Sequence, residues 1–144
     1  MPMSCILAAT DGSSGAVRAV IAAAELAKAL SGDLLIATFT DDMPISELQG
    51  LVRAEGGIGE ALELLATRVL LEAKERATSV GAPKVRTLSG SGDAAKGIIE
   101  TAQREQSDII VVGRRGRGQL AGLLLGSVSN KLVSLAPCRV LVVP

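Results

Sequence analysis

A chain of 144 residues has the usual size of one domain and can bury a sizeable core without metal or disulfide cross-links. Because 15 basic and 15 acidic residues give a formal net charge of zero, no global basic field is available to recruit nucleic acid or a membrane. Phe39 is the only aromatic residue, which also excludes the stacking platforms of proteins that bind single-stranded nucleic acid.

Short β-branched runs alternate along the chain with longer stretches of helical periodicity, a pattern typical of βαβ units and a parallel sheet covered on both faces. We therefore expect one α/β domain over residues 1–144. In chain order, the predicted elements are a strand over Cys5–Ala9, a helix over Ser14–Leu30, a strand over Leu34–Thr40, a helix over Ile58–Val80, a strand over Lys84–Leu88, a helix over Asp93–Glu105, a strand over Asp108–Val112, a helix over Ser127–Leu135 and a strand over Arg139–Val143.

Two of these helices carry predictions about packing. Gly97 lies inside the helix predicted over residues 93–105, where glycine costs about 1 kcal/mol relative to alanine, and we interpret it as a point of close packing. The helix predicted over residues 58–80 has a stripe of apolar side chains at three- and four-residue steps, which we expect to be buried. The members of this stripe are Ile58, Leu62, Leu65, Val69, Ala73 and Val80.

The chain contains two cysteines and no histidine. Cys5 and Cys138 each begin a predicted strand without the CxxC spacing of metal sites, and we interpret them as two buried, reduced thiols rather than a disulfide. No basic segment precedes the short apolar stretch at the N-terminus, and the longest apolar runs fall well below the roughly 20 residues that span a bilayer. The sequence therefore predicts a soluble, cytoplasmic protein.

Polar or glycine-rich segments follow three of the predicted strands at their carboxyl ends, which is where ligands bind in open parallel sheets. After the fourth strand, Gly113 and Gly116 permit close approach and positive φ angles, so that several N–H groups can converge on a phosphate. Gly126 and Ser127 open the last helix, whose first amides and positive dipole end form a second anion cradle, with the hydroxyls of Ser127 and Ser129 as further donors. Local cations add to this predicted site: Arg114, Arg115, Arg117 and Lys131.

Two residues near these strand ends have alternative interpretations. Asp11 either accepts a hydrogen bond from a ribose or holds a divalent metal that bridges phosphates, or else it is a turn or helix-capping residue. Phe39 either covers a base or belongs to the core, and a lone phenylalanine favours the core.

Two nucleotide-binding motifs can be rejected. The P-loop pattern G-x-x-x-x-G-K-[ST] does not occur in the sequence. Residues 90–95, "GSGDAA", match the dinucleotide fingerprint G-x-G-x-x-A, but Asp93 would place a negative charge at the pyrophosphate. We therefore predict a turn followed by Asp93 as a helix cap.

Three segments closely resemble the universal stress proteins: "ILAATDGS", "SGSGDAAKGIIETAQREQSDIIVVGRRGRG" and "LLLGSVSNKLVSLAPCRVLVV". The spacing Gly113-x2-Gly116-x9-Gly126-Ser127 is similar to the glycine pattern of the ATP-binding branch of that family. The resemblance implies a Rossmann-like fold of the adenine nucleotide alpha hydrolase type. Its sheet is open, parallel and five-stranded, in the order 3-2-1-4-5, with helices on both faces.

The resemblance also implies ATP with Mg²⁺ across the ends of the first and fourth strands, and a homodimer through the apolar edge strand Arg139–Val143. Asp11 is implied to meet the metal only indirectly, through the nucleotide. The residues implied to contact ATP are Ala9, Thr10, Asp11 and Phe39 around the adenosine, Val112 and Gly113 along the pocket, and Gly116, Gly126, Ser127, Val128 and Ser129 at the phosphates.

The composition favours a binding protein over a fast enzyme, because the chain has neither histidine nor tyrosine for acid–base catalysis and no assigned pair of carboxylates near the phosphates. We expect a stress or signalling protein in which ATP stabilises one subunit state and so changes partner binding. Two alternatives stay open: a slow ATP hydrolase or phosphotransferase that uses the same pocket, and a dimerisation module that binds no nucleotide.

Overall fold

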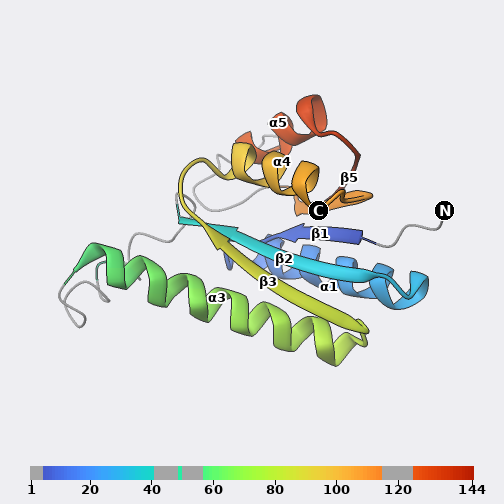
Figure 1. The fold of residues 1–144 in the computed structure, drawn as a ribbon, viewed down its shortest axis with the longest axis horizontal. Coiled ribbons are helices and arrows are strands. Elements are labelled where there is room, and N and C mark those ends of the chain that lie inside the picture. Colours follow the sequence, from blue (N-terminus) through green and yellow to red (C-terminus); the bar gives the residue numbers. More distant parts are fainter. Residues whose placement is uncertain (1–4, 41–48, 50–56, 115–124) are drawn as a thin grey trace.

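The computed structural model describes residues 5–40, 49, 57–114 and 125–144 (Figure 1). Five elements have the predicted bounds, and each end of the other four lies within two residues of its prediction. In chain order the elements are β1 (Cys5–Ala9), α1 (Ser14–Leu30), β2 (Asp33–Phe39), α3 (Ile58–Val80), β3 (Lys84–Gly90), α4 (Ala94–Arg104), β4 (Ile109–Gly113), α5 (Ser127–Leu135) and β5 (Arg139–Val143).

All strand pairings in the sheet are parallel, and the strands lie in the order β3-β2-β1-β4-β5, which confirms the expected fold. β1 is the central strand, because Leu7 pairs with Leu35 of β2 on one side and with Ile110 of β4 on the other. β1 and β4 are therefore neighbours in the sheet although about a hundred residues separate them in the chain.

Helices cover both faces of the sheet, with α1 and α3 on one face and α4 and α5 on the other (Figure 1). Alternate residues of each strand supply the two cores, since successive side chains of a strand point to opposite faces. Ile6 and Val111 pack towards α1 and α3, whereas Leu7 and Ile110 pack towards α4 and α5.

The buried face of α3 differs from the predicted stripe. Ile58 is 63% exposed, and Val80 is only half-buried. α3 packs against α1, whose buried face also consists mainly of alanines, and small side chains let two helices approach closely while larger apolar residues lie at the margin. The prediction is confirmed for Leu65 and Ala73 only. The buried residues of α3 are Ala61, Leu65, Ala66, Leu70, Ala73 and Ala77.

Cys5 and Cys138 are both free thiols, as predicted, but they are half-buried rather than buried. Burial, and after it the negative charge of Asp108, raises the pKa of the Cys138 thiol. The Asp108 carboxylate also accepts a hydrogen bond from the Cys5 N–H at 3.0 Å. A raised pKa favours the protonated thiol, which is the less reactive form.

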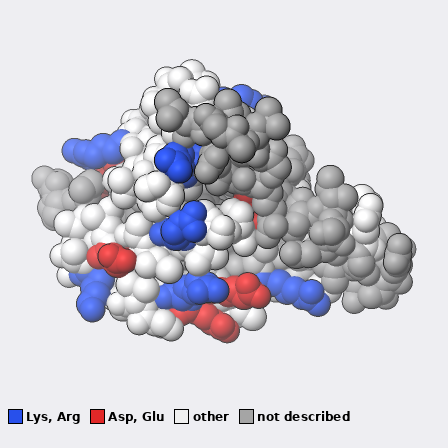
Figure 2. Space-filling model, turned by 180° about the vertical axis from the view of Figure 1, so that it is seen from behind, with Lys and Arg blue, Asp and Glu red and all other residues white. Residues whose placement is uncertain are grey.

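Acidic and basic side chains are interspersed along the lower part of the face drawn in Figure 2. This mixture of signs agrees with the zero net charge of the chain. None of the helices within the described ranges is both long and apolar enough to cross a membrane.

Candidate functional site

The carboxyl ends of β1 and β4 lie side by side near the centre of the sheet, where Ala8 pairs with Val111. After β1 the chain runs into α1 on one face, whereas after β4 it leads to α5 on the other face. Such a divergence is a topological switch point, where open parallel sheets bind ligands. We call this region the switch-point edge and define it as residues 9–16, 112–114 and 126–129.

The β1 side of the switch-point edge is a tight turn held by its own polar groups. The buried Thr10 donates its N–H to the carbonyl of Ala37 at 2.9 Å and accepts the Gly12 N–H on its hydroxyl at 3.1 Å. Asp11 Oδ1 accepts the Ser13 N–H at 2.9 Å, and Gly12 has a φ of 81°, which favours glycine. The turn role considered for Asp11 is therefore confirmed, and its role towards a ligand stays a prediction.

Gly113, at the end of β4, lies directly against the start of α1. A Cβ at this position would lie 3.0 Å from both the carbonyl carbon and the oxygen of Gly15, so only glycine lets these two main chains approach so closely. The positive φ expected at Gly113 is not observed, because the glycines with positive φ among the described residues are Gly12, Gly81 and Gly92. Gly113 thus places β4 against α1.

The first turn of α5 is fastened to the end of β4 by hydrogen bonds. Gly126 donates its N–H to the carbonyl of Arg114 at 2.8 Å. The Ser129 hydroxyl lies 2.8 Å from the carbonyl oxygen of Gly113 and 3.0 Å from that of Arg114, and Ser129 is only 3% exposed. Ser127 is exposed and Val128 is half-buried. The predicted phosphate-binding turn is therefore brought next to β4.

The helix N-termini differ in how their amides are used. The Ser13 hydroxyl accepts the Ala16 N–H at the start of α1, and the Asp93 carboxylate accepts the Lys96 N–H at the start of α4, which confirms Asp93 as a cap. α3 has no capping side chain, but Glu60 lies in its first turn. α5 follows Gly126 with neither a capping side chain nor an acidic residue in its first turn. Among the described helices, α5 therefore has the N-terminus best prepared to receive an anion.

Phe39, at the carboxyl end of β2, is 6% exposed and belongs to the core beneath α4. A Cβ on Gly90 would lie 2.7 Å from the Phe39 ring, and one on Gly97 would lie closer still. The ring therefore packs against glycines of β3 and α4, which confirms both the core interpretation of Phe39 and the close packing expected at Gly97. That residue 39 flanks a base stays a prediction.

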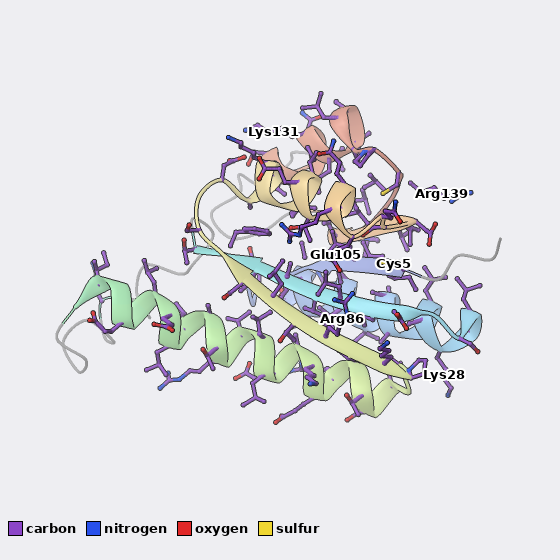
Figure 3. The ribbon with its side chains drawn as sticks, viewed as in Figure 1. Cys5, Lys28, Arg86, Glu105, Lys131 and Arg139 are labelled. Carbon is purple, nitrogen blue, oxygen red and sulfur yellow. The ribbon has the colours of Figure 1, made fainter. Side chains whose placement is uncertain are left out.

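The predicted cations are only partly described. Arg114 is half-buried, and within the described residues its Nε is buried without a hydrogen-bond partner. Lys131 lies on α5 and is exposed (Figure 3). Three predicted site residues, Gly116, Arg115 and Arg117, lie outside the described residues.

Two contacts of this region were not predicted from the sequence. The approach of Gly15 to Gly113 has a weak signal, since glycine is unfavourable in the first turn of a helix and its presence needs a reason. The bonds from Ser129 have no local signal, because their acceptors lie 16 and 15 residues earlier in the chain.

Comparison with known proteins gives consistent matches over almost the whole chain. The model of the universal stress protein family matches residues 3–144. A universal stress protein of Thermus aquaticus is 36% identical over 138 residues, which is 96% of each chain. A universal stress protein solved in complex with cAMP is 28% identical with a TM-score of 0.73, covering 99% of this chain and 98% of its own. The universal stress protein UspA from Lactobacillus plantarum has a similar fold, with a TM-score of 0.80 at 23% identity, covering 100% of this chain and 99% of its own.

Proposed function

The chain belongs to the universal stress protein family, and from this membership we propose that it binds an adenine nucleotide, namely ATP, at the switch-point edge. It acts as a nucleotide-dependent binding protein in stress or signalling rather than as a fast enzyme. The related protein solved with cAMP supports an adenine nucleotide as the class of ligand.

The observation that carries this proposal is the uncapped first turn of α5. The N–H groups of Ser127, Val128 and Ser129 have no acceptor within the helix, because the first intrahelical bond runs from Asn130 N–H to Gly126 O at 3.0 Å. Among the residues that the structure describes, no capping side chain or acidic first-turn residue accepts from these donors. The positive end of the helix dipole adds to their attraction for phosphate oxygens. The proposal also includes Gly116 as a phosphate contact, and this residue lies outside the described part of the chain.

The adenosine lies across the ends of β1, β2 and β4, where Ala9, Thr10, Val112 and Gly113 form the wall and Phe39 flanks the base. Asp11 accepts a hydrogen bond from the ribose, since a carboxylate can accept several hydrogen bonds while it supports the turn through Ser13. Because the Phe39 ring is buried against Gly90 and Gly97, it cannot present its face to the base without leaving the core. We therefore assign residue 39 to the boundary of the base site.

The residues of the switch-point edge fit an Mg²⁺ ion that would be bound mainly by the phosphates of the nucleotide. The ion commonly keeps several waters and binds through one or two carboxylates together with substrate phosphates. Asp11 is the only carboxylate of the switch-point edge, and within the described ranges no group of three or more His, Cys, Asp or Glu residues could hold a metal by itself. The nucleotide therefore carries the metal, and Mg²⁺ would neutralise phosphate charge there.

Binding without rapid turnover follows from the groups at this edge. Hydrolysis of ATP needs an oriented water and a group that orients it, in addition to donors that hold the phosphates. The chain has no histidine, and the proposal assigns Asp11, the carboxylate of the switch-point edge, to the ribose and to the turn before α1. ATP then acts as a ligand that stabilises one subunit state.

We also propose that β5 pairs two copies of the chain. β5 is an edge strand with Leu141 39% exposed, and Val133 and Leu135 of the preceding helix are 55% and 66% exposed. The opposite edge strand, β3, carries Lys84 and Arg86, and Arg86 pairs with Glu105 at 2.9 Å (Figure 3). Charged side chains discourage edge-to-edge pairing, and β5 carries a single charge, Arg139 at its first position, so β5 is the edge better suited to a second copy.

The dimer is tested by analytical ultracentrifugation of Leu141→Lys, with Thr87→Lys on the exposed edge strand β3 as the matched control. We expect Leu141→Lys to sediment as a monomer and Thr87→Lys to sediment as the wild type does. A wild-type monomer at micromolar concentration, or an unchanged dimer in Leu141→Lys, would contradict pairing through β5.

Nucleotide binding is tested by isothermal titration calorimetry of the wild-type protein with ATP in the presence of Mg²⁺, with cAMP as a competitor. We expect saturable binding of ATP that cAMP reduces, and no sustained release of phosphate in a parallel assay. Absence of binding at millimolar ATP would contradict the proposal. Sustained phosphate release that Asp11→Ala abolishes would show that the site is instead that of a hydrolase.

A further inference from the structure

The first turn of α5 contains two serines in opposite surroundings. Ser127 is exposed at the first position of the helix. Ser129, two residues later, is 3% exposed, and its hydroxyl is within hydrogen-bond distance of the carbonyls of Gly113 and Arg114. Sequence alone predicts the same role, donation to a phosphate, for both hydroxyls.

The peptide groups of Arg114 are held from three directions. The N–H donates to the carbonyl of Val143 at 2.7 Å, which continues the pairing of β4 with β5. The carbonyl accepts the Gly126 N–H at 2.8 Å and lies 3.0 Å from the Ser129 hydroxyl. These bonds fix the start of α5 against the ends of two strands, so the position of the turn depends on them.

A serine hydroxyl has one hydrogen to donate. At Ser129 that hydrogen is shared between two carbonyl oxygens, and an ionised phosphate oxygen can only accept. Donation from Ser129 to a phosphate would therefore require the hydroxyl to leave both carbonyls. The exposed Ser127 hydroxyl carries no such bond among the described residues and is available to a ligand.

We propose that Ser129 is a positioning residue of the nucleotide site, whereas Ser127 contacts the phosphates. The Ser129 hydroxyl holds the first turn of α5 against β4, so that the amides of this turn keep one arrangement before phosphate arrives. Donors arranged in advance bind more tightly because less ordering is needed on binding. This inference rests on the proposed function and assigns different roles to two side chains of one site.

The test uses four proteins: the wild type, Ser129→Ala, Ser129→Thr and Ser127→Ala. Ser129→Thr keeps the hydroxyl, and Ser127→Ala removes a hydroxyl from the same turn, so these two variants are matched controls. Amide hydrogen exchange at Gly126 is followed by NMR without added nucleotide, and the affinities for ATP and for adenosine are measured by calorimetry. Exchange at Thr10, whose N–H bonds to Ala37, reports on the rest of the fold.

In Ser129→Ala we expect Gly126 to exchange roughly fivefold to tenfold faster and ATP to bind weaker by a similar factor, because one hydrogen bond has this net value. Exchange at Thr10 and the affinity for adenosine stay as in the wild type. Ser129→Thr restores both quantities. Ser127→Ala weakens ATP binding without changing exchange at Gly126.

The inference would be overturned by unchanged exchange at Gly126 in Ser129→Ala, by an equal loss of affinity for adenosine and ATP, or by failure of Ser129→Thr to restore what Ser129→Ala loses. If the wild type bound no ATP, the proposed function would fail and this assignment with it. If the wild type bound ATP and Ser129→Ala bound it equally well, only the assignment of Ser129 would fail.

Discussion

The N-termini of α4 and α5 are similar in sequence but differ in what their amides contact. Both helices follow a strand in the chain, and both are preceded by glycine, with "GSGD" before α4 and "LLLG" before α5. At α4 the Asp93 carboxylate accepts the Lys96 N–H at 2.9 Å, so the protein itself supplies the negative charge. At α5 the cap is Gly126, and no side chain of the described residues takes that place.

This difference shows that a glycine-rich approach to a helix does not by itself indicate a phosphate site. What matters is whether a side chain of the protein already accepts from the first amides. The location of each turn agrees with this reading, since α5 starts at the switch point between β1 and β4, whereas α4 follows the edge strand β3.

Adding a capping carboxylate to α5, as α4 has in Asp93, should have the largest effect on ATP binding. Gly126→Asp adds a side chain that accepts from the first turn and repels phosphate, so we expect ATP affinity to fall by at least about tenfold. The backbone at Gly126 is extended, with φ −73° and ψ 171°, a conformation that aspartate adopts without strain. Because Gly126 is buried, a control of the same side-chain size is needed. Calorimetry with ATP measures the loss.

Gly126→Asn is the control that adds a similar side chain without charge, and it should lose less affinity than Gly126→Asp. Thermal unfolding of both variants shows that they are folded. If Gly126→Asp bound ATP with wild-type affinity, the amides of α5 would not be the phosphate donors, and the contrast drawn between α4 and α5 would be wrong.

The position of β4 is the next feature to test. In Gly113→Ala the new Cβ would meet the main chain of Gly15 at 3.0 Å, and such overpacking lowers the free energy of unfolding by about 1–3 kcal/mol. Gly59→Ala is the control, because a Cβ there meets nothing within 4 Å and alanine favours the helix. Urea denaturation measures both variants, and a Gly113→Ala protein as stable as the wild type would contradict the close approach.

Removing the cap of α4, so that its first amides are as free as those of α5, should have a smaller effect. Asp93→Ala removes the cap of α4 and should lower the free energy of unfolding by about 1 kcal/mol, while ATP affinity and stoichiometry stay unchanged. Urea denaturation and calorimetry check the two parts. A second molecule of ATP bound by Asp93→Ala would show that an uncapped helix N-terminus is enough to bind ATP, wherever it lies in this fold. That result would contradict the importance of the switch point.

The elements themselves could be predicted from local patterns, and the reasons are visible in particular residues. α3 ends where expected because Gly81 takes a φ of 114°, a conformation that glycine adopts without strain. The order of the strands has no local signal, and the resemblance to a family supplied it. The prediction for the buried face of α3 was wrong for most of its residues, because the alanines of α1 decide which side of α3 can pack closely against that helix.

The residues of the candidate site could be proposed from the sequence, but their individual roles could not. Strand ends and glycine spacing predicted its members, and the structure brings the described ones other than Phe39 together at the switch-point edge. Two roles depended on distant neighbours: Phe39 is buried against Gly90 and Gly97, and Ser129 bonds to carbonyls of β4. Such contacts arise from the packing of separate elements, which local sequence does not encode.

The central claim is that phosphates bind to the amides at the start of α5 and not to those at the start of α4. The most direct measurement is a titration with ATP and Mg²⁺ followed by the ¹⁵N–¹H amide signals of the wild-type protein. We predict large, saturable shifts for Ser127, Val128 and Ser129, and little change for Ala94, Ala95 and Lys96. Saturable shifts at α4, with the signals of α5 unmoved, would contradict it.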